Sequence, residues 1–381
     1  MLTTLGFVIF FVVAGRLIVP LPLRKSVKCL LALVVLPFSQ YYYICRTFLG
    51  SSVSPEMPYP LHVFFGFGFI LVALLCVLLL LRDIFLLLRG LARKAGFGKA
   101  RPFSPARRAF AAAGLGVALG GYGFHSAVKA PGIADVEVVL NNLPPALDKL
   151  VIAHISDLHV CGMLPRERVE AVVDAVRDMD PDILFCTGDL IDGSTFKRAN
   201  DVAPLRRLRA RYGIFCCEGN HEYYSGYAAW MRVFSDMGLK HLHNEHALIS
   251  LLGTKLVVAG LDDSAGVRYG KTGPDIKKAL ANAPHGPVIL LAHKPELARK
   301  NAQYPVDLQL SGHTHGGQIW GFDQIVASRN NGFLRGLYQV DKMRLYVNSG
   351  AGLWTGFPVR LGVPSEIARI VLRSGRRYKE R

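Results

Sequence analysis

The stretch Lys149-Leu-Val-Ile-Ala-His-Ile-Ser-Asp-Leu-His159 joins an apolar run to a pair of polar side chains. Residues 149–155 are almost continuously apolar, as expected for a strand that is covered on both faces of its sheet. A helix is predicted at about 165–179, where four valines between 169 and 176 recur at helical spacing. A buried strand, a polar pair at its end and a helix in this order are typical of an α/β domain.

Downstream of this stretch, short apolar runs alternate with segments of helical periodicity. The runs lie at 183–187, 213–217, 255–260, 287–292, 308–310, 344–347 and 366–372. Helical segments near 227–237, 274–283 and 295–303 separate several of them. This alternation predicts an α/β fold with a largely buried sheet, and such sheets bind ligands at the carboxyl ends of their strands.

Five polar clusters follow apolar runs, so their side chains are expected to converge at one edge of the sheet. They are Asp157-Leu-His159; Gly188-Asp189-Leu-Ile-Asp192; Gly219-Asn220-His221-Glu222; Ala292-His293-Lys294; and Gly312-His313-Thr314-His315-Gly316-Gly317. Each cluster alone has an ordinary explanation, such as a capping Asp or a glycine in a tight turn. Together they offer the oxygen and nitrogen donors that Mn, Fe, Zn and similar ions bind. Two ions about 3.5–4 Å apart need a shared carboxylate and about three further ligands each, and this set contains them.

The ordered motifs Asp-x-His, Gly-Asp-x-x-Asp, Gly-Asn-His-Glu, His and Gly-His-x-His resemble those of the calcineurin-like metallophosphoesterase superfamily. The fuller Gly-His-Thr-His-Gly-Gly-Gln at 312–318, together with the N-terminal apolar segments, is similar to the membrane-associated YkuE/YaeI-like branch. The resemblance covers about 148–372. It implies a two-sheet sandwich flanked by helices, with two divalent metal ions (Mn, Fe, Zn or similar) at loops that end strands.

The resemblance also implies a role for each motif residue. The implied ligands are Asp157, His159 and His315 for one ion, Asn220, His293 and His313 for the other, and Asp189 between them. His221 would face the substrate and give a proton to the leaving oxygen, and Asp192 would orient it. Hydroxide bridging the ions would attack phosphorus, while the ions neutralise charge on the phosphoryl oxygens.

Several other polar residues leave alternatives open. Asp262 and Asp263 follow another apolar run, and they either belong to the substrate pocket and its surroundings or form a plain turn. His154 lies inside an apolar run and is interpreted as structural. A local group of histidines, His241, His243 and His246, is interpreted as surface chemistry.

The first 130 residues differ from the rest in charge. They contain 14 Lys and Arg against two acids, whereas the whole chain contains 45 and 28 and carries a formal charge of +17. Most of residues 131–381 is therefore close to neutral, which disfavours a basic groove and a nucleic-acid partner. We predict a transmembrane module at 1–130, a linker at 131–147 and a metallophosphoesterase domain at 148–381.

Four apolar segments of the module are predicted to span a membrane, at 2–21, 27–45, 61–81 and 109–127. A hydrocarbon core about 30 Å thick needs roughly 20 apolar residues, and 61–81 meets this most clearly. Lys and Arg gather between the first two segments and again at 89–108. The positive-inside bias then places both basic loops in the cytoplasm and the catalytic domain outside the plasma (inner) membrane. With only three spans, the domain would lie in the cytoplasm instead.

These observations predict a multi-pass membrane hydrolase that acts on a phosphate ester or pyrophosphate. Its expected substrate is a phosphorylated lipid, a lipid-linked molecule or a small phosphoester close to membrane lipids. Trp320 and Phe322 either contact an acyl chain or pack in the core. One alternative is a UDP-2,3-diacylglucosamine pyrophosphatase of lipid A synthesis, whose chemistry belongs on the cytoplasmic side. Another is a non-catalytic membrane scaffold, which the complete ligand set disfavours.

Overall fold

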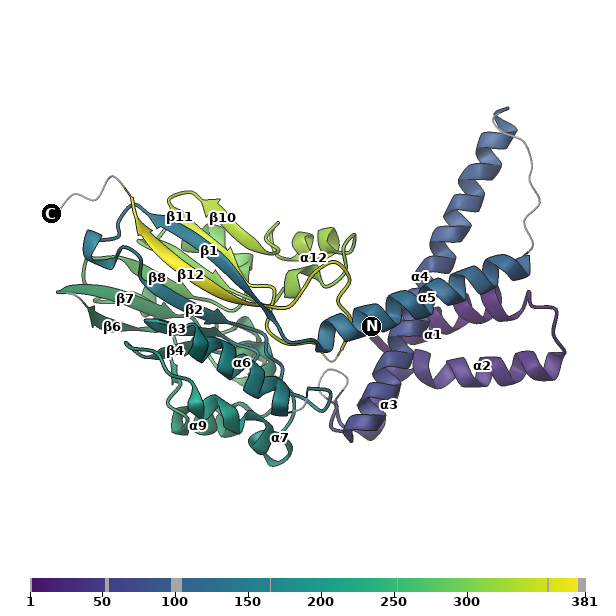
Figure 1. The fold of residues 1–381 in the computed structure, drawn as a ribbon, viewed down its shortest axis with the longest axis horizontal. Coiled ribbons are helices and arrows are strands. Elements are labelled where there is room, and N and C mark those ends of the chain that lie inside the picture. The colour runs from purple at the N-terminus through teal and green to yellow at the C-terminus, as the bar shows by residue number, and fades with distance from the viewer. Residues whose placement is uncertain are drawn as a thin grey trace. The chain divides into compact units, whose positions relative to one another are not determined.

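The computed structural model describes residues 2–51, 55–96, 105–164, 166–251, 253–354 and 356–375. The chain divides into two compact units. One contains Met1–His125 and Thr355–Val359, and the other contains Ser126–Trp354 and Arg360–Arg381. The first unit is helical, whereas the second contains both sheets of the structure (Figure 1).

The first sheet of the larger unit has six strands in the order β1-β12-β2-β3-β4-β5. Their bounds are β1 Gly132–Leu140, β2 Val151–Ile155, β3 Ile183–Thr187, β4 Ile214–Cys217, β5 Lys240–His241 and β12 Glu366–Ser374. Strands β2 to β5 are parallel, and β12 runs antiparallel to β2 and parallel to β1. The carboxyl ends of β2, β3 and β4 therefore lie at one edge of this sheet.

The second sheet has the order β10-β11-β9-β8-β7-β6. Its strands are β6 Glu245–Leu251, β7 Thr254–Gly260, β8 Val288–Leu291, β9 Leu308–Ser311, β10 Gly336–Val340 and β11 Met343–Val347. Strands β7, β8, β9 and β11 are parallel, while β6 and β10 pair antiparallel with their neighbours. The predicted two-sheet sandwich flanked by helices is confirmed.

Alternate side chains of the central strands pack on opposite faces, which explains the continuous apolar runs. Between the sheets, Ile152 and Phe185 of the first sheet share a buried core with Val258 and Leu291 of the second. Leu290, one residue from Leu291, belongs to another core on the outer face of the second sheet. Burial on both faces leaves few polar positions in these strands, so the functional side chains lie at the strand ends.

Helices cover the outer faces of the sandwich (Figure 1). The α-helices are α6 Arg166–Asp178, α7 Thr195–Val202, α8 Asn220–Tyr224, α9 Tyr227–Asp236, α10 Ile276–Ala279, α11 Ala298–Asn301 and α12 Asp323–Arg329. Short 3₁₀ turns are η2 Pro145–Leu147, η3 Ala203–Arg207, η4 Ser264–Tyr269, η5 Pro295–Leu297 and η6 His315–Gly317. The four valines of α6 are fully buried, in agreement with the helix predicted there.

Residues 131–147, predicted as a linker, contain strand β1 and the turn η2. Strand β1 lies at the edge of the first sheet, and its side chains alternate in burial. Asp135 and Glu137 point outward and form ion pairs with Arg369 and Arg373 of the neighbouring β12. Because Asp135 and Glu137 interrupt the apolar residues, this strand lacks the continuous apolar run that identifies the central strands.

The smaller unit consists of helices. They are α1 Leu2–Val13, the π-helical turn η1 Ala14–Ile18, α2 Lys25–Ser39, α3 Tyr41–Phe48, α4 Tyr59–Lys94 and α5 Pro105–Val128, whose last residues belong to the larger unit. Val13, Tyr41, Phe69 and Leu79 are among the buried residues of its core. The segment Thr355–Val359 belongs to this unit, where the carbonyl of Gly356 accepts a hydrogen bond from the Tyr42 hydroxyl.

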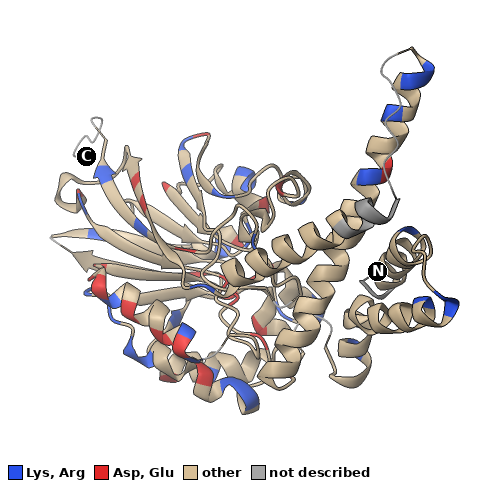
Figure 2. Cartoon of the chain, turned by 45° about the vertical axis from the view of Figure 1, so that its right-hand side comes forward, with Lys and Arg blue, Asp and Glu red and all other residues tan. Residues whose placement is uncertain are grey.

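Within the described residues, one helix, α4, is long and apolar enough to cross a membrane. Figure 2 shows that α4 lacks charge over most of its length and carries Lys, Arg and Asp toward its C-terminal end. The predicted span at 27–45 is instead a pair of helices, α2 and α3, bent by 58°, and the two would count as one further span if they cross together. Pro37 in the last turn of α2 lacks an N–H donor, which favours a break at this point.

Candidate metal centre

The candidate metal ligands lie just beyond the carboxyl ends of five strands from both sheets. Asp157 and His159 follow β2, Asp189 follows β3, Asn220 follows β4, His293 follows β8, and His313 and His315 follow β9. Each of these strands is parallel to a neighbour in its own sheet. The contact between Asp189 after β3 and His293 after β8 shows that the carboxyl ends of both sheets meet. The topology therefore gathers residues that are up to 158 positions apart in the sequence.

Five of these seven residues adopt a left-handed backbone conformation. Their φ angles are 52° at Asp157, 45° at His159, 52° at Asp189, 71° at His313 and 48° at His315. Left-handed conformations are uncommon for residues other than glycine and are found at functional sites, where the surrounding structure compensates for the strain. Here the backbone turns sharply at each strand end and directs the side chain into the site.

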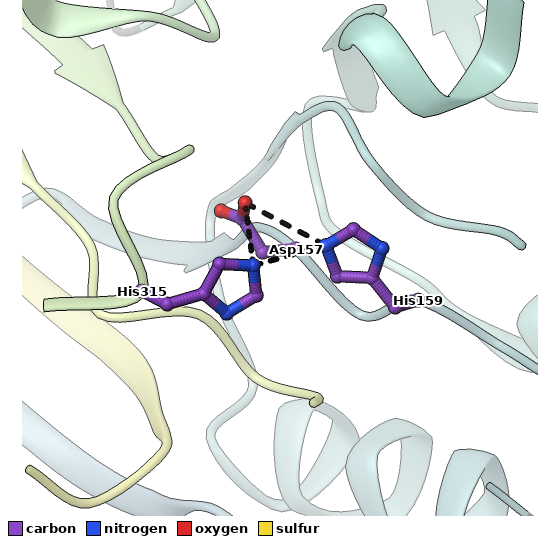
Figure 3. Close-up of side chains that lie close together, drawn as sticks. All are labelled: Asp157, His159 and His315. Atoms are coloured by element: carbon purple, nitrogen blue, oxygen red, sulfur yellow. Dashed lines mark hydrogen bonds and ion pairs between the residues drawn. The ribbon is translucent and has the colours of Figure 1, made fainter. Parts of the chain in front are cut away.

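The first group of donors consists of Asp157, His159 and His315 (Figure 3). Both imidazole rings turn a nitrogen toward the Asp157 carboxylate. The Oδ1 atom of Asp157 lies 3.5 Å from His315 Nε2 and 4.0 Å from His159 Nε2, and these two nitrogens are 3.0 Å apart. Since two donors bound to one ion at about 2.1 Å each lie at most about 4.2 Å apart, the three fit a single divalent ion.

Asp189 is shared between this group and a second one. Its Oδ2 atom lies 3.2 Å from His293 Nε2 and 3.7 Å from His159 Nε2. Asp189, His293 and His313 form the second group of converging donors. One carboxylate therefore faces histidines of both groups, which is the arrangement needed by a carboxylate between two ions.

Asn220 begins helix α8, next to His221. The backbone N–H of His221 donates a 2.8 Å hydrogen bond to Asp189 Oδ1, which holds this turn against the shared carboxylate. The Oδ1 atom of Asn220 is buried and accepts no hydrogen bond from the residues that the structure describes. A buried acceptor without a donor is costly, and a metal ion would satisfy it.

Asp192 contacts two histidines. Its Oδ1 atom contacts His221 Nδ1, and its Oδ2 atom lies 3.2 Å from His159 Nδ1. Although burial opposes the charged form, Asp192 and Asp189 raise the pKa of His221 to about 9. The Nε2 atom of His221 lies 4.0 Å from Asp189 Oδ2, so a histidine that holds a proton at neutral pH lies beside the shared carboxylate.

Residues 150–317 match the model of the calcineurin-like phosphoesterase family. An uncharacterized metallophosphoesterase of Helicobacter pylori is 36% identical over 68% of this chain and 69% of its own length. YkuE of Bacillus subtilis, an uncharacterized metallophosphoesterase, is 34% identical over 69% of this chain and 93% of its own length. The chain belongs to the calcineurin-like phosphoesterase family.

One longer relative is named as a transmembrane protein. The "transmembrane protein with metallophosphoesterase domain" of Danio rerio is 35% identical over 66% of this chain. The chain spans 60% of the length of that relative. The predicted family and branch are confirmed, and the His and Asp groups of this phosphoesterase domain suit the divalent ions on which its family depends.

Other residues of the phosphoesterase domain hold the ligands in place. Glu222, the last residue of the Gly-Asn-His-Glu motif, accepts hydrogen bonds from the backbone N–H groups of Gly219, Leu190 and Asp189 at 2.7–3.0 Å. It thereby ties the loop after β3 to the loop after β4. The motif contains Glu222, but nothing in the sequence indicates that it binds backbone rather than metal.

Further contacts orient individual ligands. His293 Nδ1 donates to the Thr187 carbonyl at 2.7 Å, which fixes the proton on Nδ1 and leaves Nε2 to face Asp189. Ser156 donates to Asp157 Oδ2 at 2.6 Å. Arg360, fully buried, donates to the carbonyls of Ser349 and Gly352 at 2.8 and 2.9 Å and lies beside His315. No local sequence pattern indicates that Arg360 belongs to this region.

Of the other polar residues noted in the sequence, His154 and Asp263 have structural contacts, whereas His243 has an unexpected environment. His154 is fully buried and bonds to Thr187 Oγ1 at 2.8 Å, as expected for a structural residue. Asp263 accepts from Ala265 N and from Lys294 Nζ, so it forms a turn and an ion pair. His243, interpreted as surface chemistry, instead lies against two buried carboxylates, those of Glu218 and Asp262.

Proposed function

We propose that this chain is a membrane-anchored phosphoesterase with two metal ions, which hydrolyses a phosphate ester or pyrophosphate of a lipid or lipid-linked molecule. The proposal rests above all on one observation, the Asp189 carboxylate shared between two groups of histidines. The family adds the reaction class, because its members are phosphoesterases.

The proposed ligands of one ion are Asp157, His159 and His315, and those of the other are Asn220, His293 and His313, with Asp189 serving both. When bound, two such ions supply an activated water and neutralise charge on the phosphoryl group. The residues of this chain do the rest. Asp192 orients His221 and favours its imidazolium, and His221 donates a proton or hydrogen bond to the leaving oxygen, a contribution of typically about 10²–10⁴-fold.

A lipid or lipid-linked substrate is supported by exposed apolar residues close to the site in sequence. Trp320, Phe322 and Ile325 follow His315 within ten residues, and 78%, 43% and 60% of their surfaces are exposed. Large exposed apolar side chains that gather in one short segment are typical of surfaces that bind apolar ligands. We propose that this segment, 320–325, contacts the acyl chain of the substrate.

Membrane anchoring is supported by α4 and by relatives that are named transmembrane proteins. We propose that the α2–α3 pair, the first helix with its π-turn, and α5 complete a four-span module. The bases at the end of α4, Arg89, Arg93 and Lys94, then face the cytoplasm, and the catalytic domain lies on the outer side of the plasma membrane.

Matched substrate pairs test the lipid proposal with the detergent-solubilised, Mn²⁺-loaded full chain. The pairs are dioleoyl phosphatidic acid and glycerol 3-phosphate, dioleoyl phosphatidylglycerol and glycerophosphoglycerol, and CDP-diacylglycerol and CDP-glycerol. In the pair that is hydrolysed, we expect the long-chain member to have a kcat/KM at least about tenfold higher, since each buried CH₂ contributes about 0.8 kcal/mol. Trp320→Ser should lower this ratio, whereas Leu248→Ser, on the edge strand β6, should not. Equal kcat/KM values for both members would exclude a lipid substrate.

Protease added to intact spheroplasts tests the orientation. We expect the catalytic domain to be cleaved from outside, without lysis. Protection until lysis would place the domain in the cytoplasm and would favour a cytoplasmic substrate such as UDP-2,3-diacylglucosamine.

A further inference from the structure

A cluster of three residues lies outside the residues assigned to the two-ion centre. Glu218 directly follows β4, Asp262 follows β7, and His243 follows β5. The Nδ1 atom of His243 lies 3.2 Å from Glu218 Oε2 and 3.3 Å from Asp262 Oδ1. These three donor atoms all lie within 4.8 Å of one another.

In each carboxylate of the cluster, the oxygen that does not face His243 accepts hydrogen bonds from neighbouring side chains. Glu218 Oε1 accepts a 2.9 Å hydrogen bond from the Tyr223 hydroxyl. Asp262 Oδ2 accepts from Asn244 Nδ2 and from Thr272 Oγ1, both at 2.8 Å. Neighbours that fix one oxygen of a carboxylate in this way orient the other oxygen, as the outer partners of metal ligands do.

Among the described residues, the two carboxylate oxygens that face His243 have no such donors. Glu218 is fully buried and Asp262 is 8% exposed, yet Glu218 Oε2 and Asp262 Oδ1 accept no hydrogen bond within the described part of the chain. Two buried carboxylates that face each other need a compensating positive charge. A proton on His243 Nδ1 can be donated well to only one oxygen at a time, and the Tyr227 hydroxyl also lies 3.3 Å from this nitrogen. A cation would satisfy both carboxylates together.

We propose that Glu218, His243 and Asp262 bind a third divalent cation, separate from the two-ion centre. The spacing supports a zinc-like ion, because donors about 2.0–2.1 Å from a tetrahedral centre lie about 3.3–3.4 Å apart. One nitrogen and two carboxylate oxygens are ligands that Zn²⁺ and similar ions accept. The His243 side chain is 38% exposed, so an ion can enter from solvent on its side.

The proposed ion would join the two sheets at one end. Strand β4 belongs to the first sheet and β7 to the second, and Glu218 and Asp262 follow these strands within two residues. Glu218 also precedes the Gly219-Asn220-His221 turn of the two-ion centre. The third ion would therefore be structural, because it would fix the backbone from which Asn220 and His221 project.

Metal analysis of the purified, zinc-saturated full chain tests this proposal. We expect three Zn²⁺ per wild-type chain and a loss of one in His243→Ala. The matched control is His285→Ala, an exposed histidine outside both sites, which should keep all three. The double variant Asp189→Asn/His293→Ala should lose ions of the two-ion centre and retain the third, which separates failure of this proposal from failure of the proposed function.

Anomalous diffraction at the zinc edge from crystals of the wild-type chain gives a second readout that does not depend on the folding of a variant. We expect a peak about 2.0–2.1 Å from Glu218 Oε2, Asp262 Oδ1 and His243 Nδ1. Two Zn²⁺ per wild-type chain, or peaks at the two-ion centre with none between these three atoms, would overturn the third site.

Discussion

At the scale of single residues, two histidines of the site have different roles because their ring nitrogens make different contacts. His293 turns Nε2 toward Asp189 because its Nδ1 donates to a backbone carbonyl. His221 contacts Asp192 through Nδ1 and keeps Nε2 at 4.0 Å from Asp189. The first histidine is thus suited to bind metal and the second to hold a proton, although both lie beyond the carboxyl ends of buried strands.

The proposed role of His221 predicts a dependence on the leaving group. His221→Gln should lower kcat by about 10²–10⁴-fold for an alkyl phosphate ester, whose leaving oxygen needs a proton. For a p-nitrophenyl ester the loss should be much smaller, since p-nitrophenolate leaves without protonation. Steady-state kinetics at saturating Mn²⁺ with both esters would measure this. An equal loss with both esters would mean that His221 does not act on the leaving oxygen.

Removal of the Asp192 carboxylate should shift the pH profile. Asp192 and Asp189 raise the pKa of His221 to about 9 by favouring the imidazolium, although burial opposes it. In Asp192→Asn this pKa falls, so the proton is lost at lower pH, and the alkaline limb of kcat should move down by about one pH unit or more. The profile should be recorded at saturating metal, because Asp192 also contacts His159. An unchanged alkaline limb would contradict this role of Asp192.

At this scale, the sequence alone indicates only the motif residues of the site. The motif order indicated which residues converge, and the structure brings Asp157, His159, His315 and Asp189 together as expected. The positive φ angles of five candidate ligands and the second contact of Asp192 depend on how loops cross, which no local pattern encodes. The Glu218–His243–Asp262 cluster was missed for the same reason, since its members come from three separate elements.

At the scale of elements, the loops at the strand ends work because the backbones approach closely. A Cβ atom added to Gly312, just after β9, would collide with Ser156 Oγ and with Asp157 Oδ2. Glycine at this position therefore allows the loop with His313 and His315 to lie against Asp157, whose carboxylate accepts from the backbone N–H of His313 at 2.9 and 3.0 Å.

Gly312→Ala should displace the Asp157 carboxylate and weaken metal binding at the two-ion centre. We expect the metal affinity, measured by titration with Mn²⁺, to fall by at least about tenfold, as for loss of a group that orients a ligand. The matched control is Gly132→Ala, where open space surrounds the added methyl group. Equal Mn²⁺ affinities in Gly312→Ala, Gly132→Ala and wild type would show that the close approach does not support the site.

The sequence predicted the central strands better than the edge strands. Strands β2, β3 and β8 are covered on both faces, and their apolar runs were found. Strands β1 and β6 alternate buried with exposed residues, so the sequence predicts a linker where β1 lies and does not indicate β6. In the N-terminal unit, composition indicates one span at 27–45. Pro37 is visible in the sequence, but composition does not resolve the 58° bend between α2 and α3.

At the scale of the whole molecule, the site depends on the pairing of two sheets. The alternation of strands and helices indicated an α/β domain, but it does not say which strands share a sheet, so the two-sheet sandwich was predicted through family resemblance. In the structure, the ligands that follow β2, β3 and β4 come from the first sheet, and those that follow β8 and β9 come from the second. The apolar core between the sheets, which contains Phe185 and Leu291, holds the ligands of both sheets at the same end of the sandwich.

The central claim is that Asp189 joins the two groups of ligands into one hydrolytic centre. Hydrolysis of bis-p-nitrophenyl phosphate by the purified, Mn²⁺-loaded full chain tests it most directly. We expect Asp189→Asn and His293→Ala to lower kcat by about 100-fold or more, because the charge that stabilises the transition state is lost, while His285→Ala keeps the wild-type rate. Equal rates in all four proteins would contradict the account.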